Sequence, residues 1–409
     1  MSEELRVTKK PLSVLPSLLI TLLTAPLTPA VGRAGVAERP VVESVRHISA
    51  AEYTRVIVTL SAEAAHRLFT VPADPARNLP GRIVIDFSPA RRSPQTPLSL
   101  PIQDGLLKQV RTGQFSATTV RVVLDIEQID DYKAFALESP YRLIIDVKGK
   151  VQHQPQPPQP VSRPLSAPPP EQFTTPRYRI MLDPGHGGKD PGALGEKGVA
   201  EKDVVLAISQ RLGRKLAERE QVDVLFTRTT DVFVPLEERI ARANAAKADL
   251  FVSIHANASN NSELQGVETY YLNNTNDRAT IRLASLENGL RPRGGDREDG
   301  RAGLSFLLSD LIQSGKEEES IALAHHLQEA VVLRAKQRYP AIHSLGVKKG
   351  PFYVLVGAHM PCVLVETAFI THPVEGKYLG SSDYQDALAE GLFLGIAHFL
   401  RTGLMAKSL

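Results

Sequence analysis

The sequence predicts an α/β domain with a mostly parallel sheet flanked by helices, preceded by a small all-β domain. Between residues 41 and 149, apolar and polar residues alternate with the period of two that is typical of half-buried strands. From residue 177 onward, short apolar strands alternate with segments of helical spacing, which indicates a parallel sheet covered on both faces. The length of 409 residues is sufficient for two or three domains.

The composition excludes several classes of protein. Lysine and arginine total 48 against 45 acidic residues, and a formal net charge of +3 is too small for a dedicated nucleic-acid-binding protein. The single cysteine, Cys362, excludes an internal disulfide and a cysteine-rich metal site. A bound metal would therefore need histidine and carboxylate ligands.

Residues 1–37 have the pattern of an export signal. Basic residues precede an apolar run from Leu12 to Leu27, and small residues follow it. The run contains two prolines and is shorter than the roughly 20 apolar residues of a membrane-spanning helix. We expect a cleaved signal peptide and an exported protein of the periplasm or cell envelope, in contact with the membrane only through this signal. An uncleaved anchor is the alternative.

Residues 38–150 contain an internal repeat. Two strand patterns begin the copies and two end them: TRVIVTLS (54–61), VRVVLDIE (120–127), GRIVIDFS (81–88) and YRLIIDVK (141–148). Clusters of proline, asparagine and glycine separate the strands, so we expect two related sheets. The endings Arg82–Asp86 and Arg142–Asp146 make the segment resemble the AMIN domain that precedes exported bacterial cell-wall amidases. The resemblance implies a role in cell-wall targeting; a generic β-sandwich is the alternative.

Residues 151–176 form a candidate linker. They contain nine prolines among glutamine, serine and alanine, without an apolar period. Such a composition favours an extended, semi-rigid chain. Recognition by a proline-binding partner is the alternative interpretation.

Residues 177–409 should form the α/β domain. Its expected elements are strands at 178–182, 222–227, 249–255, 266–272, 352–356 and 362–366, and helices at 201–219, 235–246 and 383–401. Proline at the first turn favours the start of the second helix. The closing helix should pack back onto the sheet.

Histidine and glutamate residues should gather at one edge of this sheet. His186 follows the first strand within DPGHGG, and Glu201 opens the first helix. His255 and Glu366 each end a later strand. Functional groups of parallel sheets lie where loops leave the carboxyl ends of the strands. Two imidazoles and a carboxylate are a common ligand set for hydrolytic Zn²⁺, although scattered histidines and glutamates occur in any enzyme.

Four motifs make the domain resemble the zinc-dependent N-acetylmuramoyl-L-alanine amidases of the Amidase_3 type: DPGHGG (183–188), Glu-Lys (201–202), SIHAN (253–257) and LVETAFIT (364–371). The resemblance implies hydrolysis of the amide bond between N-acetylmuramic acid and the L-alanine of the peptidoglycan stem peptide. It also implies one Zn²⁺ per catalytic domain, with the ligands His186, Glu201 and His255, and Glu366 as the catalytic glutamate.

Two further residues are candidates for the substrate groove. Asn257 lies within SIHAN, and His343 precedes the segment GVKKGPFYVL. Peptidoglycan is the expected partner, and no nucleic acid is expected. Two alternatives stay open, namely a catalytically silent wall-binding protein on the same fold and a zinc peptidase that cuts the stem peptide itself.

A long insertion, residues 273–350, far exceeds the usual connection of about 2 to 6 residues. The insertion contains an apolar stripe at helical spacing, which consists of Ala279, Leu283, Leu286 and Leu290, and Glu287 lies beside it. A second apolar stripe lies at 304–311. The insertion resembles that of cell-division amidases, in which a helix offers a glutamate to the zinc until an activator protein removes it. The resemblance implies that Glu287 is an autoinhibitory metal ligand and that an activator binds this helix. A surface helix at the domain edge is the alternative.

Overall fold

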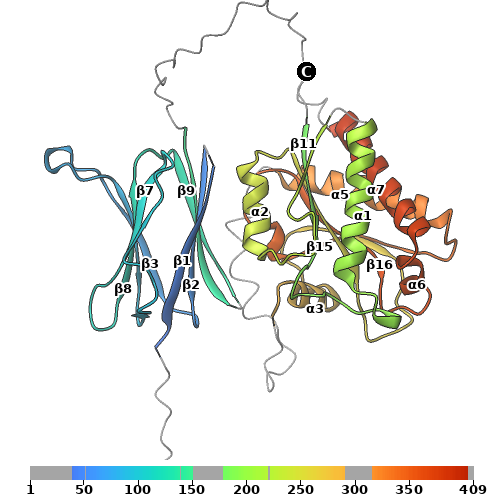
Figure 1. Cartoon of the computed structure of the whole chain (residues 1–409), viewed down its shortest axis with the longest axis horizontal. Coiled ribbons are helices and arrows are strands. Elements are labelled where there is room, and N and C mark those ends of the chain that lie inside the picture. The colour runs from blue at the N-terminus through green and yellow to red at the C-terminus, as the bar shows by residue number, and fades with distance from the viewer. Residues whose placement is uncertain are drawn as a thin grey trace, which may run out of the picture. The chain divides into compact units, whose positions relative to one another are not determined.

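The computed structural model describes residues 39–50, 52–138, 140–150, 178–219, 222–290 and 316–403. The predicted export signal, the proline-rich linker and the second apolar stripe of the insertion lie outside these residues. Within the described ranges, no helix combines the length and the apolar character needed to span a membrane. The chain forms an all-β domain and an α/β domain, as the sequence predicted (Figure 1).

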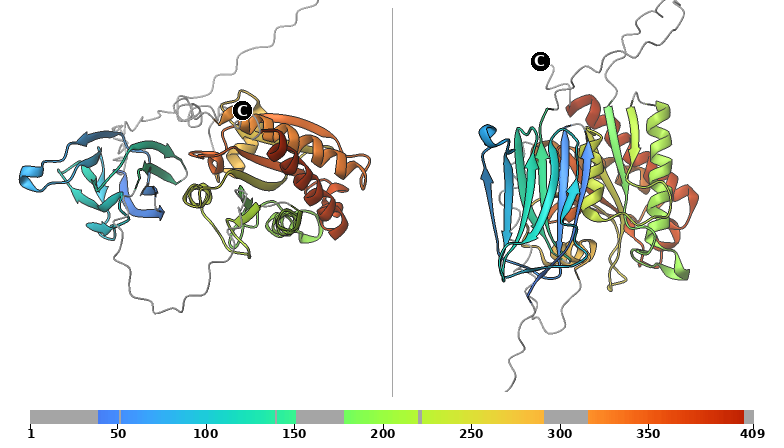
Figure 2. Two further views of the ribbon diagram at one scale, coloured as in Figure 1. Left: turned by 90° about the horizontal axis from the view of Figure 1, so that it is seen from above. Right: turned by 60° about the vertical axis from the view of Figure 1, so that its left-hand side comes forward.

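The all-β domain consists of two sheets (Figure 2). The first has the order β5-β1-β2-β10-β9 and the second the order β3-β4-β8-β7-β6. The strands are β1 (Val41–Ala50), β2 (Tyr53–Leu60), β3 (His66–Val71), β4 (Arg82–Phe87), β5 (Arg91–Arg92), β6 (Ser99–Pro101), β7 (Leu107–Gln114), β8 (Val120–Ile126), β9 (Asp131–Leu137) and β10 (Tyr141–Lys148), with a 3₁₀ turn η1 (Pro75–Arg77). Their inward residues form one apolar core that includes Val56, Ile83, Val122 and Leu143.

The two copies of the repeat exchange strands. β2 of the first copy lies antiparallel to β10 of the second, while β4 of the first lies antiparallel to β8 of the second. This register places Arg55 opposite Asp146 and Arg121 opposite Asp86, and both pairs form ion pairs, of 2.6 and 2.7 Å. The arginine that opens each copy therefore binds the aspartate that closes the other copy.

The α/β domain is built on one six-stranded sheet with the order β12-β11-β13-β16-β14-β15. Neighbouring strands are parallel except β14 and β16, which are antiparallel. The strands are β11 (Tyr178–Pro184), β12 (Val222–Phe226), β13 (Leu250–Asn257), β14 (Val267–Leu272), β15 (Ser344–Gly350) and β16 (Cys362–Phe369). The prediction of a mostly parallel sheet is confirmed.

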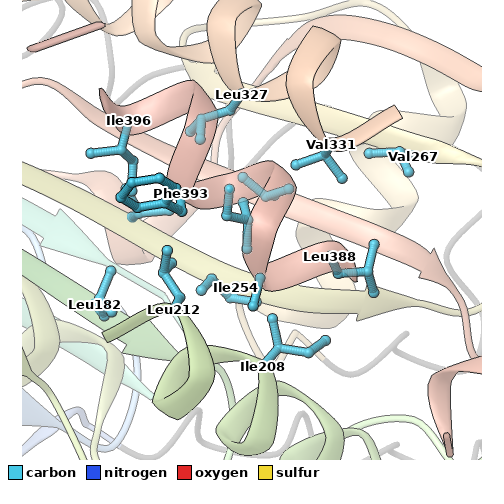
Figure 3. Close-up of a cluster of buried hydrophobic side chains, with 14 of the residues drawn as sticks. Leu182, Ile208, Leu212, Ile254, Val267, Leu327, Val331, Leu388, Phe393 and Ile396 are labelled. Atoms are coloured by element: carbon cyan, nitrogen blue, oxygen red, sulfur yellow. The ribbon is translucent and has the colours of Figure 1, made fainter. Parts of the chain in front are cut away.

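Helices cover both faces of this sheet. They are α1 (Glu201–Arg219), α2 (Leu236–Ala245), α3 (Arg278–Glu287), α5 (Glu317–Lys336), α6 (Glu375–Leu379) and α7 (Ser382–Gly403), with 3₁₀ turns η2 (Glu196–Gly198) and η3 (Tyr353–Leu355). On one face, α1, α5 and α7 pack against strand residues such as Leu182 and Ile254 (Figure 3). On the other, α2 and α3 pack against alternate residues such as Met181 and Phe251. A sheet buried on both faces reads as continuous apolar strands.

One predicted strand is wrong. Residues 352–356 were expected to be extended, but the apolar run contains the 3₁₀ turn η3 and is buried throughout. The strand that precedes this run is β15, at the edge of the sheet next to β14. Its consecutive lysines Lys348 and Lys349 interrupt the alternation of apolar and polar residues by which a strand is recognised. Lysine is common on edge strands because it discourages pairing with another chain.

The apolar stripe predicted in the insertion is also wrong in part. The helix exists as α3, but Leu286 is 56% exposed and Ala279 is exposed. The face that packs against the domain carries Thr280, Leu283 and Ala284. The buried face therefore differs from the predicted one, which was chosen from apolar residues alone and so left out the polar Thr280.

Candidate metal centre and active site

The turn after β11 places His186 at the carboxyl edge of the sheet. His186 has a φ of +57°, a left-handed conformation that is uncommon outside glycine and often marks a functional site. The buried Arg239 of α2 holds the turn, donating hydrogen bonds to the carbonyl oxygens of Pro184 and His186, both at 2.7 Å. Arg239 also pairs with the buried Asp183 at 2.9 Å.

Glu201 reaches the same edge from the first turn of α1. Its two carboxylate oxygens accept hydrogen bonds from the backbone N–H groups of Ala193, at 2.9 Å, and Ala256, at 3.0 Å. Gly192 passes so close that a Cβ atom there would lie 2.5 Å from Glu201 Oε2 and 2.7 Å from His186 Cδ2. Only glycine therefore lets the loop wrap around both side chains.

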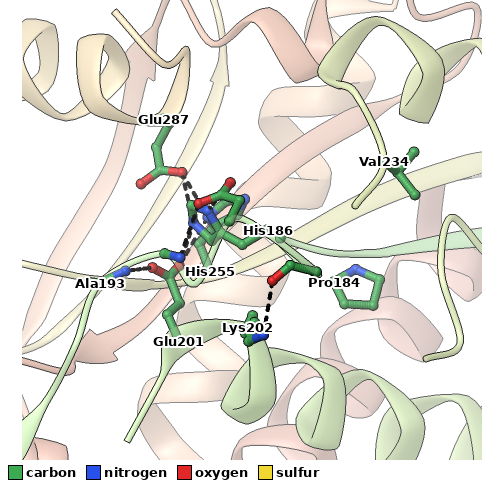
Figure 4. A network of polar contacts seen from close by, with 12 residues as sticks. Pro184, His186, Ala193, Glu201, Lys202, Val234, His255 and Glu287 are labelled. Atoms are coloured by element: carbon green, nitrogen blue, oxygen red, sulfur yellow. Dashed lines mark hydrogen bonds and ion pairs between the residues drawn. The ribbon is translucent and has the colours of Figure 1, made fainter. Parts of the chain in front are cut away.

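Four potential ligand atoms converge at this edge: one each from His186, Glu201, His255 and Glu287, all within 4.8 Å of one another (Figure 4). Glu201 Oε1 lies 3.2 Å from His186 Nε2 and 3.1 Å from His255 Nδ1. Glu287 Oε2 lies 3.4 Å from His186 Nε2 and 3.0 Å from His255 Nδ1. The structure thus brings together the three predicted metal ligands and the glutamate of the insertion.

This geometry fits a zinc ion. Tetrahedral Zn²⁺ with bonds of roughly 2.0–2.1 Å has nitrogen and oxygen ligands about 3.3 Å apart, close to the four distances observed. His186 Nε2 and Glu287 Oε2 are buried without a hydrogen-bond partner among the described residues. Such atoms are costly to bury unless another group satisfies them. Two imidazoles with two carboxylates are a donor set that zinc accepts.

The cluster strongly perturbs the protonation of its histidines. Burial alone would lower the pKa of His255, but Glu287 and Glu201 outweigh it and raise the pKa to about 10. The pKa of His186 is raised well above its usual value, since Glu201 and Glu287 again outweigh burial. The carboxylates are correspondingly held ionised; the pKa of Glu201 falls to about 2 because the histidines overcome its burial. A cation is strongly favoured at this position, whether protons or a metal ion supply the charge.

Glu366 lies on the strand next to His255, and the two residues are opposite each other in the register of β13 and β16. Its side chain is fully buried, and neither carboxylate oxygen has a hydrogen-bond partner among the described residues. Burial, followed by the charge of Glu287, raises the pKa of Glu366 well above its usual value. A carboxylate in this state is suited to take up and release a proton.

The two groove candidates have different environments. Asn257 is buried at the end of β13, and its amide donates a 2.6 Å hydrogen bond to Glu268 of β14. His343 is exposed directly before β15, and its carbonyl oxygen accepts a hydrogen bond from the backbone of Val267. A contact with substrate stays a prediction for both residues.

Several residues around the site were not predicted. Asp190 contacts the second imidazole nitrogen of His186 at 2.9 Å, Arg239 fixes the turn, and Glu268 binds Asn257. Asp190 could have been suspected, since it lies four residues after a candidate metal ligand and such histidines usually donate to a carboxylate. Arg239 and Glu268 carry no comparable signal, because only the fold brings them to the site.

The buried donor cluster could hold a metal ion, and it lies at the carboxyl edge of the sheet, where the functional groups of such folds gather. The sequence model of a family described as N-acetylmuramoyl-L-alanine amidase matches residues 180–398, and that of the AMIN domain matches residues 50–135. The chain belongs to the N-acetylmuramoyl-L-alanine amidases and carries an AMIN domain.

Two relatives similar in sequence agree with this assignment. The chain is 32% identical to the N-acetylmuramoyl-L-alanine amidase AmiC of Neisseria meningitidis, over 87% of this chain and 89% of that relative. It is also 32% identical to AmiC of Escherichia coli, over 88% and 90% of the two chains. The solved structure of AmiC2 of Nostoc punctiforme is 32% identical and covers 55% of this chain and 97% of that one, with a TM-score of 0.41.

Proposed function

We propose that this amidase cleaves the bond between N-acetylmuramic acid and L-alanine with the help of one zinc ion held by His186, Glu201 and His255. The convergence of these three side chains, with Glu366 on the adjoining strand, is the observation that carries the proposal. A zinc ion held by these residues would lower the pKa of a water molecule and polarise a substrate carbonyl, which is chemistry that promotes amide hydrolysis.

The protein residues would share the remaining work. Glu201 keeps its orientation through two backbone hydrogen bonds, so its carboxylate can serve as a ligand without rearrangement. Glu366 would accept the proton of the attacking water and deliver it to the leaving nitrogen. Its buried position and raised pKa support both steps, because a carboxyl group with a raised pKa takes up a proton more readily than an ordinary carboxylate does.

We also propose that α3 inhibits the enzyme. Glu287 Oε2 lies beside both imidazoles, at the place that a substrate carbonyl and a water molecule would need. Substrate could then bind only after α3 moves away. An activator protein that binds the helix, for example through the exposed Leu286, would relieve this block.

The AMIN domain and the terminal signal suggest where the enzyme acts. We propose that the AMIN domain targets the chain to peptidoglycan and that residues 1–37 direct its export to the periplasm or cell envelope. Resemblance to cell-division amidases supports a role in the separation of daughter cells. In this scheme the linker at 151–176 joins the targeting domain to the catalytic domain.

Mass spectrometry of digested peptidoglycan tests the proposed reaction. Zinc-loaded protein should release stem peptides with a free L-alanine amino group and leave intact glycan strands; a chelator should abolish the release and added Zn²⁺ should restore it. Products cut within the stem peptide would identify a zinc peptidase instead. Intact peptidoglycan after incubation with a zinc-loaded Glu287→Ala variant would indicate a catalytically silent protein.

A further inference from the structure

Asp190 has a position that the proposed reaction has not yet used. His186 directs its Nε2 atom towards the metal-ligand cluster and its Nδ1 atom towards Asp190 Oδ2, at 2.9 Å. A proton on Nδ1, donated to this carboxylate, leaves the lone pair of Nε2 free. The contact thus selects the tautomer that can bind a metal.

The loop holds Asp190 in place for this task. Its second oxygen accepts a 3.1 Å hydrogen bond from the backbone N–H of Gly192. The backbone groups of Asp190 and Gly187 also form two hydrogen bonds with each other, at 2.9 and 3.2 Å, which close the turn that directly follows His186. The same segment continues to Ala193, whose N–H binds Glu201. One short loop therefore orients two of the proposed ligands.

We propose that Asp190 is a positioning residue, which fixes the tautomer and ring orientation of His186 and thereby raises the affinity of the site for Zn²⁺. This inference rests on the proposed zinc function. Removal of such an outer carboxylate typically lowers metal affinity or activity by about 10- to 100-fold. Because the Asp190 side chain is 42% exposed, the expected loss is nearer the lower end of that range.

The test compares zinc affinities of full-length wild type and Asp190→Ala by competition with a chromophoric chelator. Asp231→Asn is the matched control, since Asp231 binds the backbone N–H of Gly188 in the same loop, at 2.6 Å. We expect the dissociation constant of Asp190→Ala to rise at least tenfold and that of Asp231→Asn to change less than threefold. Asp190→Asn should lie in between, because an amide can accept the hydrogen bond but lacks the charge.

A second measurement separates positioning from a general structural effect. In zinc-loaded protein with ¹⁵N-labelled histidine, the Nδ1–H proton of His186 should be protected from exchange with solvent in the wild type and should exchange faster in Asp190→Ala, which lacks the carboxylate that accepts it. Unchanged affinity and an unchanged exchange rate in Asp190→Ala would overturn the inference, with the proposed zinc function intact. Failure of the wild type itself to bind zinc would instead refute the proposed function.

Discussion

Replacement of Glu287 by alanine should activate the enzyme in the absence of any partner. In the closed state the Glu287 carboxylate contacts two imidazoles, at 3.0 and 3.4 Å, and it is 13% exposed. One contact between a carboxylate and a positively charged centre is taken to contribute roughly 1.5–3 kcal/mol, the range of a hydrogen bond to a charged group. Loss of one such contact should therefore shift the equilibrium towards the open state by about 10- to 150-fold.

Other contacts of α3 remain in this variant and continue to favour the closed state. Asn288 donates to the carbonyl oxygen of Pro351 at 2.9 Å and accepts from the N–H of Tyr353 at 2.8 Å. Leu283 and Ala284 also stay buried. The observed gain in rate will stop once the open state predominates, so a gain below the calculated shift would indicate that wild type is already partly open.

The assay is dye release from labelled sacculi at equal zinc occupancy. Arg282→Ala is the matched control, because Arg282 is exposed on the same helix. We expect at least a tenfold higher initial rate for Glu287→Ala and an unchanged rate for Arg282→Ala. Equal or lower rates in a folded Glu287→Ala variant would refute the inhibitory role and favour a structural helix at the domain edge.

Three further predictions concern catalysis, stability and targeting. Glu366→Gln should retain zinc but lose about 10²- to 10⁴-fold in turnover, since general acid–base catalysis contributes that much; metal analysis and kinetics check both statements. Asp183→Ala should lower the free energy of unfolding by about 3–5 kcal/mol because it leaves the buried Arg239 without its partner; urea denaturation measures this change. Deletion of residues 41–149 should reduce the fraction of protein that sediments with sacculi.

Each of these predictions has an outcome that contradicts it. Stoichiometric loss of zinc in Glu366→Gln would make this glutamate a ligand rather than a base. Ser253→Ala is the control for Asp183→Ala, since it removes one 2.7 Å hydrogen bond to Asp183 and should cost only about 1 kcal/mol; equal losses would mean that the ion pair adds little. Unchanged sedimentation after the deletion would assign wall binding to the catalytic domain.

The sequence predicted the strands and the helix that carry the site residues, because helical spacing and apolar strands can be recognised from neighbouring residues alone. One face of α1 carries apolar residues at helical spacing that are all buried, and the predicted bounds 201–219 agree with the structure; these residues are Val204, Val205, Ile208, Leu212 and Leu216. His255 and Glu366 lie in the carboxyl-terminal halves of β13 and β16, and the parallel register places them side by side. The rule that functional groups gather at the carboxyl edge of a sheet therefore locates these residues without any knowledge of distances.

The buried face of α3 and the contact of Asp190 with His186 could not be predicted, because they depend on backbone geometry that the spacing of apolar residues does not reveal. The inward face of α3 carries Thr280, which is only 1% exposed and whose hydroxyl donates a hydrogen bond to Asp277, and this polar residue interrupts the apolar pattern. The role of Asp190 depends on a turn with positive φ at His186, which the sequence of a glycine-rich loop does not specify. Residue type could identify these side chains as candidates, but only the backbone conformation brings them to their partners.

The strand exchange in the β domain affects the order in which that domain can form. Arg55 and Asp146 are 91 positions apart, and β2 cannot complete its pairing until β10 is available. During synthesis from the N-terminus, the first half of the domain therefore emerges with a central strand lacking one neighbour. Such non-local pairing slows folding, and a fragment that ends before Tyr141 would keep an open sheet edge on which other chains could assemble.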